Sequence, residues 1–272
     1  EVEENGSSNH ITDIAYQGGK LYVWGDYSFR IRPVSHEVDA AYRYDALGSS
    51  DCFLATLDAT NLKYDKWRFY KSSGEDRALE LTVTPGGVYL AGRAGGTLSS
   101  VTGALSALGG TAATLSGEST APHLFWDKVS TSDLTLSWHV TPLEGGSASI
   151  PTIQRVGGIG VAGNSVFITG GWHLGTLTMG TVASNKTLPA PPLPGGFVGF
   201  LQDDGSWKQG VRVDIVSQFG NPQPQRGTIS LTAGGTITAS VEPVVYENAA
   251  GQLISNTDPA TINAVAVTRR IC

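Results

Sequence analysis

The sequence predicts an all-β protein, and more specifically a four-bladed β-propeller with about 70 residues in each blade. Three observations support this prediction: a glycine-rich composition without helical periodicity, a hairpin motif that occurs four times, and an order of strands that is repeated behind each hairpin. Of the 272 residues, 35 are Gly, 13 are Pro and 40% are hydrophobic, which allows both a packed core and many tight turns. The composition therefore excludes disorder, collagen and long helical bundles.

Four segments are similar around a Gly-Gly or Gly-Asn pair, and each is expected to form a β-hairpin. Alternating apolar residues flank the pair, and Gly and Asn adopt the positive φ of tight hairpin turns with the least strain. The four turns lie 68, 77 and 71 residues apart, so four such units fill the chain. The segments are ITDIAYQGGKLYVWG (11–25), ALELTVTPGGVYLAG (78–92), IGVAGNSVFITGG (159–171) and ISLTAGGTITASV (229–241).

The strands that follow each hairpin complete the expected blades. A long connection rich in Gly, Pro, Ser and Thr leads to a short apolar strand, and in three units a further strand carries Trp67, Trp138 or Trp207. The chain ends shortly after AVAVTRR (264–270), so the last blade lacks an outer strand of its own. The glycine-rich segment 101–115 is expected to be a loop, because each Gly weakens a helix. The expected blades cover residues 11–71, 77–140, 152–213 and 227–272 of a single domain, 1–272.

Closure of such a ring needs a partner for the open edge of the last blade. Residues 1–10 are the candidate closing strand, although Val2 is the only strongly β-prone residue among them. The alternative is that the open edge accepts a strand from another subunit, which would make the protein self-associating. Both alternatives stay open at this point.

The repeats resemble the bacterial β-propeller repeat family often called SBBP. The resemblance lies in the motifs SDCFLATLDA (50–59), GGVYLAG (86–92), VTGALSALGG (101–110), NSVFITGG (164–171) and GGFVGFLQDDGSW (195–207), and the first and fourth repeats depart most from the family pattern. It implies an exported or cell-surface protein that serves as a scaffold or binding module. On this basis we expect a non-catalytic structural or interaction module of an exported or cell-surface assembly.

Two cysteines, Cys52 and Cys272, are the candidates for a disulfide. A bond within the chain would pin the C-terminal end, whereas the alternatives are two free thiols or a bond between subunits. Their spacing matches no zinc-binding or redox motif.

Four aromatic residues are the candidate ligand-binding residues, because exposed Trp and Tyr rings form stacking platforms for sugars. They lie at the ends of the expected second strands or in the loops that follow: Trp24, Tyr27, Tyr42 and Trp172. A carbohydrate-binding, lectin-like propeller is therefore the second hypothesis for function. The competing interpretation of Trp24 and Trp172 is that they fill space between blades.

No catalytic or metal-binding residue is assigned from the sequence, and no cofactor is expected. The five histidines are scattered and fit no hydrolase or metalloprotease motif, so His123 and His139 are interpreted as packing or surface residues. An extracellular hydrolase or lyase with its site at the mouth of the propeller channel is the third hypothesis, and it needs a clustered acid/base or metal constellation. Calcium is conceivable at three carboxylate pairs, but no calcium-binding loop is present. These pairs are Glu75 and Asp76, Asp203 and Asp204, and Asp58 and Asp65.

The charge pattern narrows the classes of partner. The formal net charge is −6, with 18 basic and 24 acidic residues, which gives no electrostatic reason to expect nucleic acid. No stretch approaches the about 18 consecutive apolar residues of a membrane-spanning helix. Protein partners or self-association are therefore expected first, and a glycan second.

Overall fold

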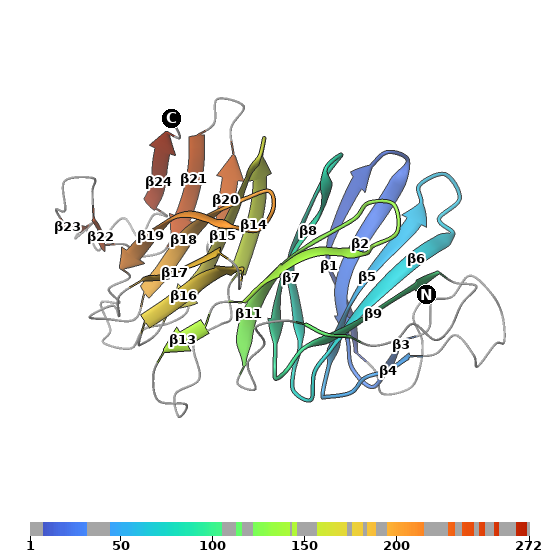
Figure 1. The fold of residues 1–272 in the computed structure, drawn as a ribbon. Coiled ribbons are helices and arrows are strands. Elements are labelled where there is room, and N and C mark those ends of the chain that lie inside the picture. Colours follow the sequence, from blue (N-terminus) through green and yellow to red (C-terminus); the bar gives the residue numbers. More distant parts are fainter. Residues whose placement is uncertain are drawn as a thin grey trace, which may run out of the picture. The chain divides into compact units, whose positions relative to one another are not determined.

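The computed structural model confirms that the protein is all-β. It describes residues 8–31, 44–104, 113–115, 122–141, 143–145, 157–172, 176–181, 184–188, 195–214, 228–231, 236–241, 245–247, 253–255 and 265–270. Within these ranges every regular element is a β-strand, and all paired strands are antiparallel (Figure 1). In this part of the chain no helix is long and apolar enough to cross a membrane.

The chain divides into two compact units, Glu1–Thr141 and Pro142–Cys272. Their strands form several separate sheets, and each unit contains two of the expected repeats. The closed four-bladed ring, and the single domain that it would create, stay predictions.

The first unit contains two large sheets, here called sheet 1 and sheet 2. Sheet 1 has the strand order β1-β2-β5-β6-β9-β10, and sheet 2 has the order β12-β11-β8-β7. The strands of sheet 1 are β1 (Asn9–Gln17), β2 (Lys20–Tyr27), β5 (Asp51–Asp58), β6 (Tyr64–Lys71), β9 (Ser99–Ala104) and β10 (Ala113–Thr114). Those of sheet 2 are β7 (Arg77–Thr84), β8 (Gly87–Ala94), β11 (His123–Val129) and β12 (Leu136–Val140). A short pair, β3 (Arg30–Ile31) and β4 (Tyr44–Asp45), lies in the connection between β2 and β5.

The second unit repeats this pattern of strands. One sheet has the order β14-β15-β18-β19, and a second has the order β20-β21-β24, one strand fewer in the described residues. The strands of these sheets are β14 (Gly157–Ala162), β15 (Ser165–Trp172), β18 (Gly195–Gln202), β19 (Trp207–Asp214), β20 (Thr228–Leu231), β21 (Thr236–Val241) and β24 (Val265–Arg270). Smaller sheets contain β13 (Leu143–Gly145), β16 (Thr176–Thr181), β17 (Ser184–Leu188), β22 (Val245–Glu247) and β23 (Leu253–Ser255).

The hairpin turns follow the predicted chemistry at two of the three described positions. Gly18 and Gly19 have φ of +58° and +79°, and Gly163 has +56°, so a side chain there would be strained. At the turn between β7 and β8, in contrast, Gly86 and Gly87 do not use positive φ. The backbone therefore does not require glycine at that turn.

A register irregularity recurs in three equivalent hairpins. The pairing shifts by one residue between Thr56 and Leu57 of β5, between Lys128 and Val129 of β11, and between Phe200 and Leu201 of β18. Such bulges re-aim side chains and raise the local twist. Their recurrence at one place supports the equivalence of these strand pairs.

The structure corrects the prediction for the segment 101–115 and the prediction for two residues of the expected closing strand. The segment 101–115, expected to be a loop, contains most of β9 and all of β10, and β9 extends sheet 1 by pairing with β6. Asn9 and His10 of the expected closing strand belong to β1 and pair with Tyr27 and Asp26. Residues 1–7 lie outside the described residues, so the seal itself stays a prediction.

The main core of the first unit lies between sheet 1 and sheet 2. Sheet 1 contributes its inner face, defined by Tyr22, Trp24, Cys52, Leu54 and Tyr70, all buried. Hydrogen bonds also cross between the sheets. Among them, the Trp24 indole N–H donates to the carbonyl of Ala91 (2.9 Å), and the Leu81 amide donates to the Asp13 carboxylate (3.0 Å). Together, apolar burial and these bonds hold sheet 2 against sheet 1.

Candidate functional site

The other side of sheet 1, here called the outer face, carries three rows of uncharged, mainly apolar residues. Side chains alternate between the two sides of a strand, so the register decides which residues share a side. From β1 to β6, the first row is Ile11, Gly25, Phe53 and Phe69; the second is Ile14, Val23, Ala55 and Trp67; the third is Tyr16, Leu21, Leu57 and Tyr64. None of the residues in these three rows carries a charged side chain.

Burial on the outer face decreases towards the edge strand β1. Trp67 and Phe69 of β6 are buried, whereas Ile11, Ile14 and Tyr16 of β1 are 59%, 54% and 64% exposed. Single exposed apolar residues are ordinary, but three in line beside an apolar face make this face a candidate interaction surface. Sequence analysis missed this surface, because the alternation on β1 is shifted by a bulge at Thr12.

A cavity of about 240 Å³ opens on the outer face over Phe53. Its walls include Ile11, Val23, Ala55 and Trp67, and Asn9, on the same side of β1 as Ile11, adds a polar group. Tyr44 packs against Phe69 and Trp67, with ring centroids 4.2 and 4.5 Å apart.

Gly25 lies opposite Phe53 in the pairing of β2 with β5 and gives its ring room. A Cβ atom at Gly25 would lie 2.9 Å from that ring.

The outer face of sheet 1 corresponds to a covered face of sheet 2. Gly25 faces Phe53 across β2 and β5, and Gly92 faces Phe125 across β8 and β11 in the same way. In sheet 2 this position is covered by sheet 1, because the rings of Tyr70 and Trp24 lie 5.4 and 6.4 Å from Phe125. The two equivalent faces therefore differ: the face of sheet 2 is covered by sheet 1, whereas the outer face of sheet 1 is partly open.

The covered face of sheet 2 holds a chain of three polar side chains. His139 Nδ1 lies 2.5 Å from the Asp127 carboxylate, and its Nε2 lies 2.8 Å from the Thr141 hydroxyl. All three residues are buried. Carboxylate, imidazole and hydroxyl stand in the order that hydrolases use to activate a nucleophile.

This chain lies in the core between the two sheets rather than on a surface. The Phe125 ring is 6.1 Å from the His139 imidazole, and Tyr70 stacks on Phe125 from the other sheet. Burial, with a smaller effect of the nearby Asp127 carboxylate, raises the pKa of the Tyr70 hydroxyl well above its usual value. Sequence analysis interpreted His139 as a packing or surface residue and missed the chain, because the contact of Asp127 with His139 depends on strand register.

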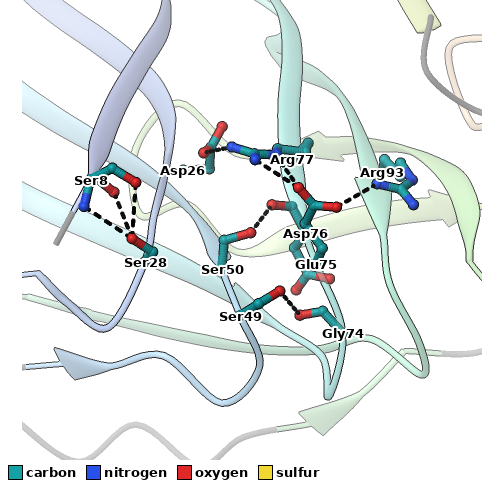
Figure 2. Close-up of polar contacts among 10 residues, drawn as sticks. All are labelled: Ser8, Asp26, Ser28, Ser49, Ser50, Gly74, Glu75, Asp76, Arg77 and Arg93. Atoms are coloured by element: carbon teal, nitrogen blue, oxygen red, sulfur yellow. Dashed lines mark hydrogen bonds and ion pairs between the residues drawn. The ribbon is translucent and has the colours of Figure 1, made fainter. Parts of the chain in front are cut away.

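A network of ion pairs and hydrogen bonds joins the connection between β6 and β7 to both sheets (Figure 2). The Arg77 guanidinium donates to Asp26 (2.8 Å) and to Glu75 (2.7 Å), and Arg93 donates to the other oxygen of Glu75 (3.4 Å). The Ser50 hydroxyl donates to the carbonyl of Asp76 (2.8 Å). This network fixes the segment that leads from sheet 1 to sheet 2.

Asp76 is the most perturbed carboxylate of this network. It is fully buried, and one of its oxygens accepts hydrogen bonds from the Gly95 amide (2.8 Å) and the Ser72 hydroxyl, while the other has no partner among the described residues. Burial raises the pKa of Asp76 to about 7, and the neighbouring charge of Asp51 contributes to the rise. Burial also raises the pKa of Asp51 and of Asp26.

The other carboxylates singled out for calcium have local partners. Asp58 accepts hydrogen bonds from the amides of Thr60 (2.8 Å) and Asn61 (3.1 Å), and Asp65 pairs with Lys20 at 2.7 Å. Asp204 accepts bonds from Ser206. In the described ranges, no group of three or more His, Cys, Asp and Glu side chains could hold a metal ion.

Two of the four candidate sugar-binding residues are buried, which corrects their interpretation. Trp24 and Tyr27 have 0% exposure, so neither offers a ring face to a ligand. Trp24 takes the packing role that was the alternative, since its ring fills the core between the sheets. Tyr42 lies outside the described residues, and Trp172 is described only by its backbone, at the end of β15 opposite Gly195.

Of the alternatives for Cys52, the structure shows the free thiol. This residue is a free thiol, completely buried in the core beside Trp24 and Leu54. Burial raises the pKa of the thiol well above its usual value, which disfavours the reactive thiolate. Cys272 lies outside the described residues.

Comparisons with protein-family models, with curated proteins and with solved structures each found no match for this chain. The resemblance to the SBBP repeats therefore stays a prediction.

Proposed function

We propose that the protein is a non-catalytic interaction module of an exported or cell-surface assembly, and that it associates through the outer face of sheet 1. The observation that carries this proposal is the apolar face itself, with Ile11, Ile14 and Tyr16 each more than half exposed. Covering such side chains is favourable by about 25 cal/mol for each Å² of apolar surface removed from water. The exported location rests on the sequence motifs alone.

The covered face of sheet 2 supports the same proposal. There the equivalent position packs against another sheet through Trp24 and Tyr70. Two sheets pack face to face by interdigitating their apolar side chains. A face of this type is therefore suited to receive a further sheet.

The experiment is a concentration series of the purified protein by sedimentation velocity and light scattering. We expect the wild type to associate as concentration rises, and Ile14→Lys to weaken this association by about tenfold or more, because burying an unpaired charge is costly. Leu47→Lys is the matched control, since Leu47 is 65% exposed and lies outside the three rows. Equal behaviour of wild type and Ile14→Lys would contradict the proposal.

The chain of Asp127, His139 and Thr141 is the observation that favours a hydrolase as the second candidate function, although all three side chains are buried. The Thr141 hydroxyl lies 2.8 Å from Nε2 of the His139 imidazole, and the Asp127 carboxylate lies 2.5 Å from its Nδ1. A fluorophosphonate probe labels an activated hydroxyl, and Thr141→Val is the control. If the probe labels the wild type but not Thr141→Val, the result favours the hydrolase. If the protein is a non-catalytic interaction module, we expect the wild type and the variant to be labelled equally.

A further inference from the structure

We infer that the partner of the outer face is a second copy of this chain, and that Tyr16 of each copy enters the cavity over Phe53 of the other. This inference rests on the proposed function and specifies its partner. The result is a two-fold dimer of the first units.

The first argument is that the projection and the cavity lie on one face. Tyr16 is 64% exposed in the third row, and the cavity opens beside Ile11 and Ala55 in the first and second rows. A surface that carries both a projecting ring and a cavity can complement itself when a two-fold axis relates the copies. Each copy then donates one ring and accepts one.

The second argument is the occupant of the equivalent position in sheet 2. Phe125 corresponds to Phe53, and the rings of Tyr70 and Trp24 cover it, one stacked and one edge-on. These rings come from another sheet. The chain thus contains one example in which aromatic rings of a neighbouring sheet cover the position that Phe53 has in sheet 1.

The size and polarity of the cavity also favour a tyrosine side chain. Its volume of about 240 Å³ lies below the roughly 300 Å³ at which small-molecule pockets begin. The walls are mainly apolar, and the Asn9 amide is a polar group on the same side of β1 as Ile11. Tyrosine suits such a site because its ring is apolar and its hydroxyl seeks a partner.

The third argument is the absence of charge from the contact surface. None of the residues in the three rows is charged, so two copies can approach without repulsion or buried ions. Beyond the first row, Asp51 lies on the same side opposite Tyr27 and is buried. Other charges lie beside the rows: Lys20 pairs with Asp65 next to the third row, and Arg30 pairs with Asp45 in β3 and β4. This distribution of an apolar centre and a polar rim is typical of protein interfaces.

The test uses two variants that remove opposite halves of the contact. Tyr16→Ser removes the projecting ring, and Ala55→Phe fills the cavity from its wall. By sedimentation velocity, we expect each variant alone to dimerise about tenfold or more weakly than the wild type. Leu47→Ser serves as the control for loss of an exposed apolar side chain.

Mixing the two variants gives a sharper result. A heterodimer of Tyr16→Ser with Ala55→Phe restores one contact, because the second variant supplies the ring and the first supplies the open cavity. We therefore expect the mixture to dimerise more strongly than either variant alone. Circular dichroism checks that both variants are folded, and Val23→Phe is the second way to fill the cavity.

Two outcomes would overturn the inference, and they bear differently on the proposed function. If the wild type associates and Ile14→Lys prevents it, but Tyr16→Ser and Ala55→Phe have no effect, the dimer geometry is wrong while the outer face remains the interface. If the wild type is monomeric at every concentration, a second copy is not the partner, and association through this face fails with it.

Discussion

The outer face of sheet 1 and the covered face of sheet 2 are built alike but filled differently. The cross-strand pair Ala55 and Trp67 of sheet 1 corresponds to the pair Asp127 and His139 of sheet 2. In sheet 2 the face is covered, and its polar groups bond to one another. In sheet 1 the same positions are apolar, and the side chains of β1 remain exposed. A covered face thus accommodates polar groups when they are paired, whereas the open face presents apolar surface for a partner.

The largest expected effect separates the two sides of sheet 1. Leu54→Ala, on the inner face, should lower the free energy of unfolding by about 2–5 kcal/mol, because it leaves a cavity in a packed core. Ile14→Ala, on the outer face, should change it by less than about 0.5 kcal/mol in the monomer. Urea unfolding at low protein concentration measures both. Similar losses for the two variants would mean that the outer face is covered in the monomer.

The polar chain of sheet 2 should be the next most sensitive feature. Asp127→Ala leaves the buried imidazole without its partner and should cost about 3 kcal/mol of unfolding free energy. Asp127→Asn keeps a side chain of the same size that can still bond to the imidazole, so its cost should be smaller. Both are measured by urea unfolding. If the Ala variant is as stable as the wild type, the pair is not part of the folded core.

The pH dependence of stability should show the buried carboxylate at Asp76. Its pKa is raised from 3.8 to about 7, so the folded state binds a proton that the unfolded state has already lost. The stabilising effect of this protonation is complete below about pH 4 and is lost as the pH rises through about 7. The loss should amount to a few kcal/mol at most, measured by urea midpoints across this range.

Asp76→Asn is the variant that isolates this effect. The amide cannot ionise, so the fall in stability between about pH 4 and 7 should become shallower, with Asp51 and Asp26 contributing what remains. Glu75→Gln is the control, because Arg77 holds the pKa of Glu75 below its usual value and the side chain is 45% exposed. An unchanged pH profile in Asp76→Asn would show that this carboxyl is not the origin of the dependence.

The smallest expected effect tests the equivalence of the two sheets. A Cβ atom at Gly25 would lie 2.1 Å from the carbonyl oxygen of His10, and one at Gly92 would lie 2.3 Å from the Phe125 ring. Gly25→Ala and Gly92→Ala should therefore each cost about 1–3 kcal/mol through overpacking. Thermal unfolding measures both, and Gly86→Ala is the control because its Cβ would meet no atom closer than 3.5 Å. A tolerated change at one of the two glycines alone would break the equivalence.

Local sequence patterns were sufficient to predict the repeated hairpins but neither strand β9 nor what covers each sheet. Gly18 and Gly19 mark the first hairpin, and the Trp67 and Trp138 strands follow third strands as expected. The role of Cys52 could not be predicted, because a small apolar thiol and half of a disulfide look alike in a sequence. Strand β9 was missed because its partner β6 lies 28 to 38 residues earlier in the chain.

The candidate site also depends partly on local sequence and partly on the tertiary structure. Consecutive apolar residues in β2 and β5 are present in the sequence and place apolar side chains on both sides of sheet 1, but the bulge in β1 hid the outer rows. Only the tertiary structure decided that Trp24 lies beneath sheet 2 while Tyr16 faces outwards, and that Asp127 meets His139. The physical reason is that side-chain alternation is a local property of an extended backbone, whereas burial and cross-strand contacts depend on which distant strands pair and in which register.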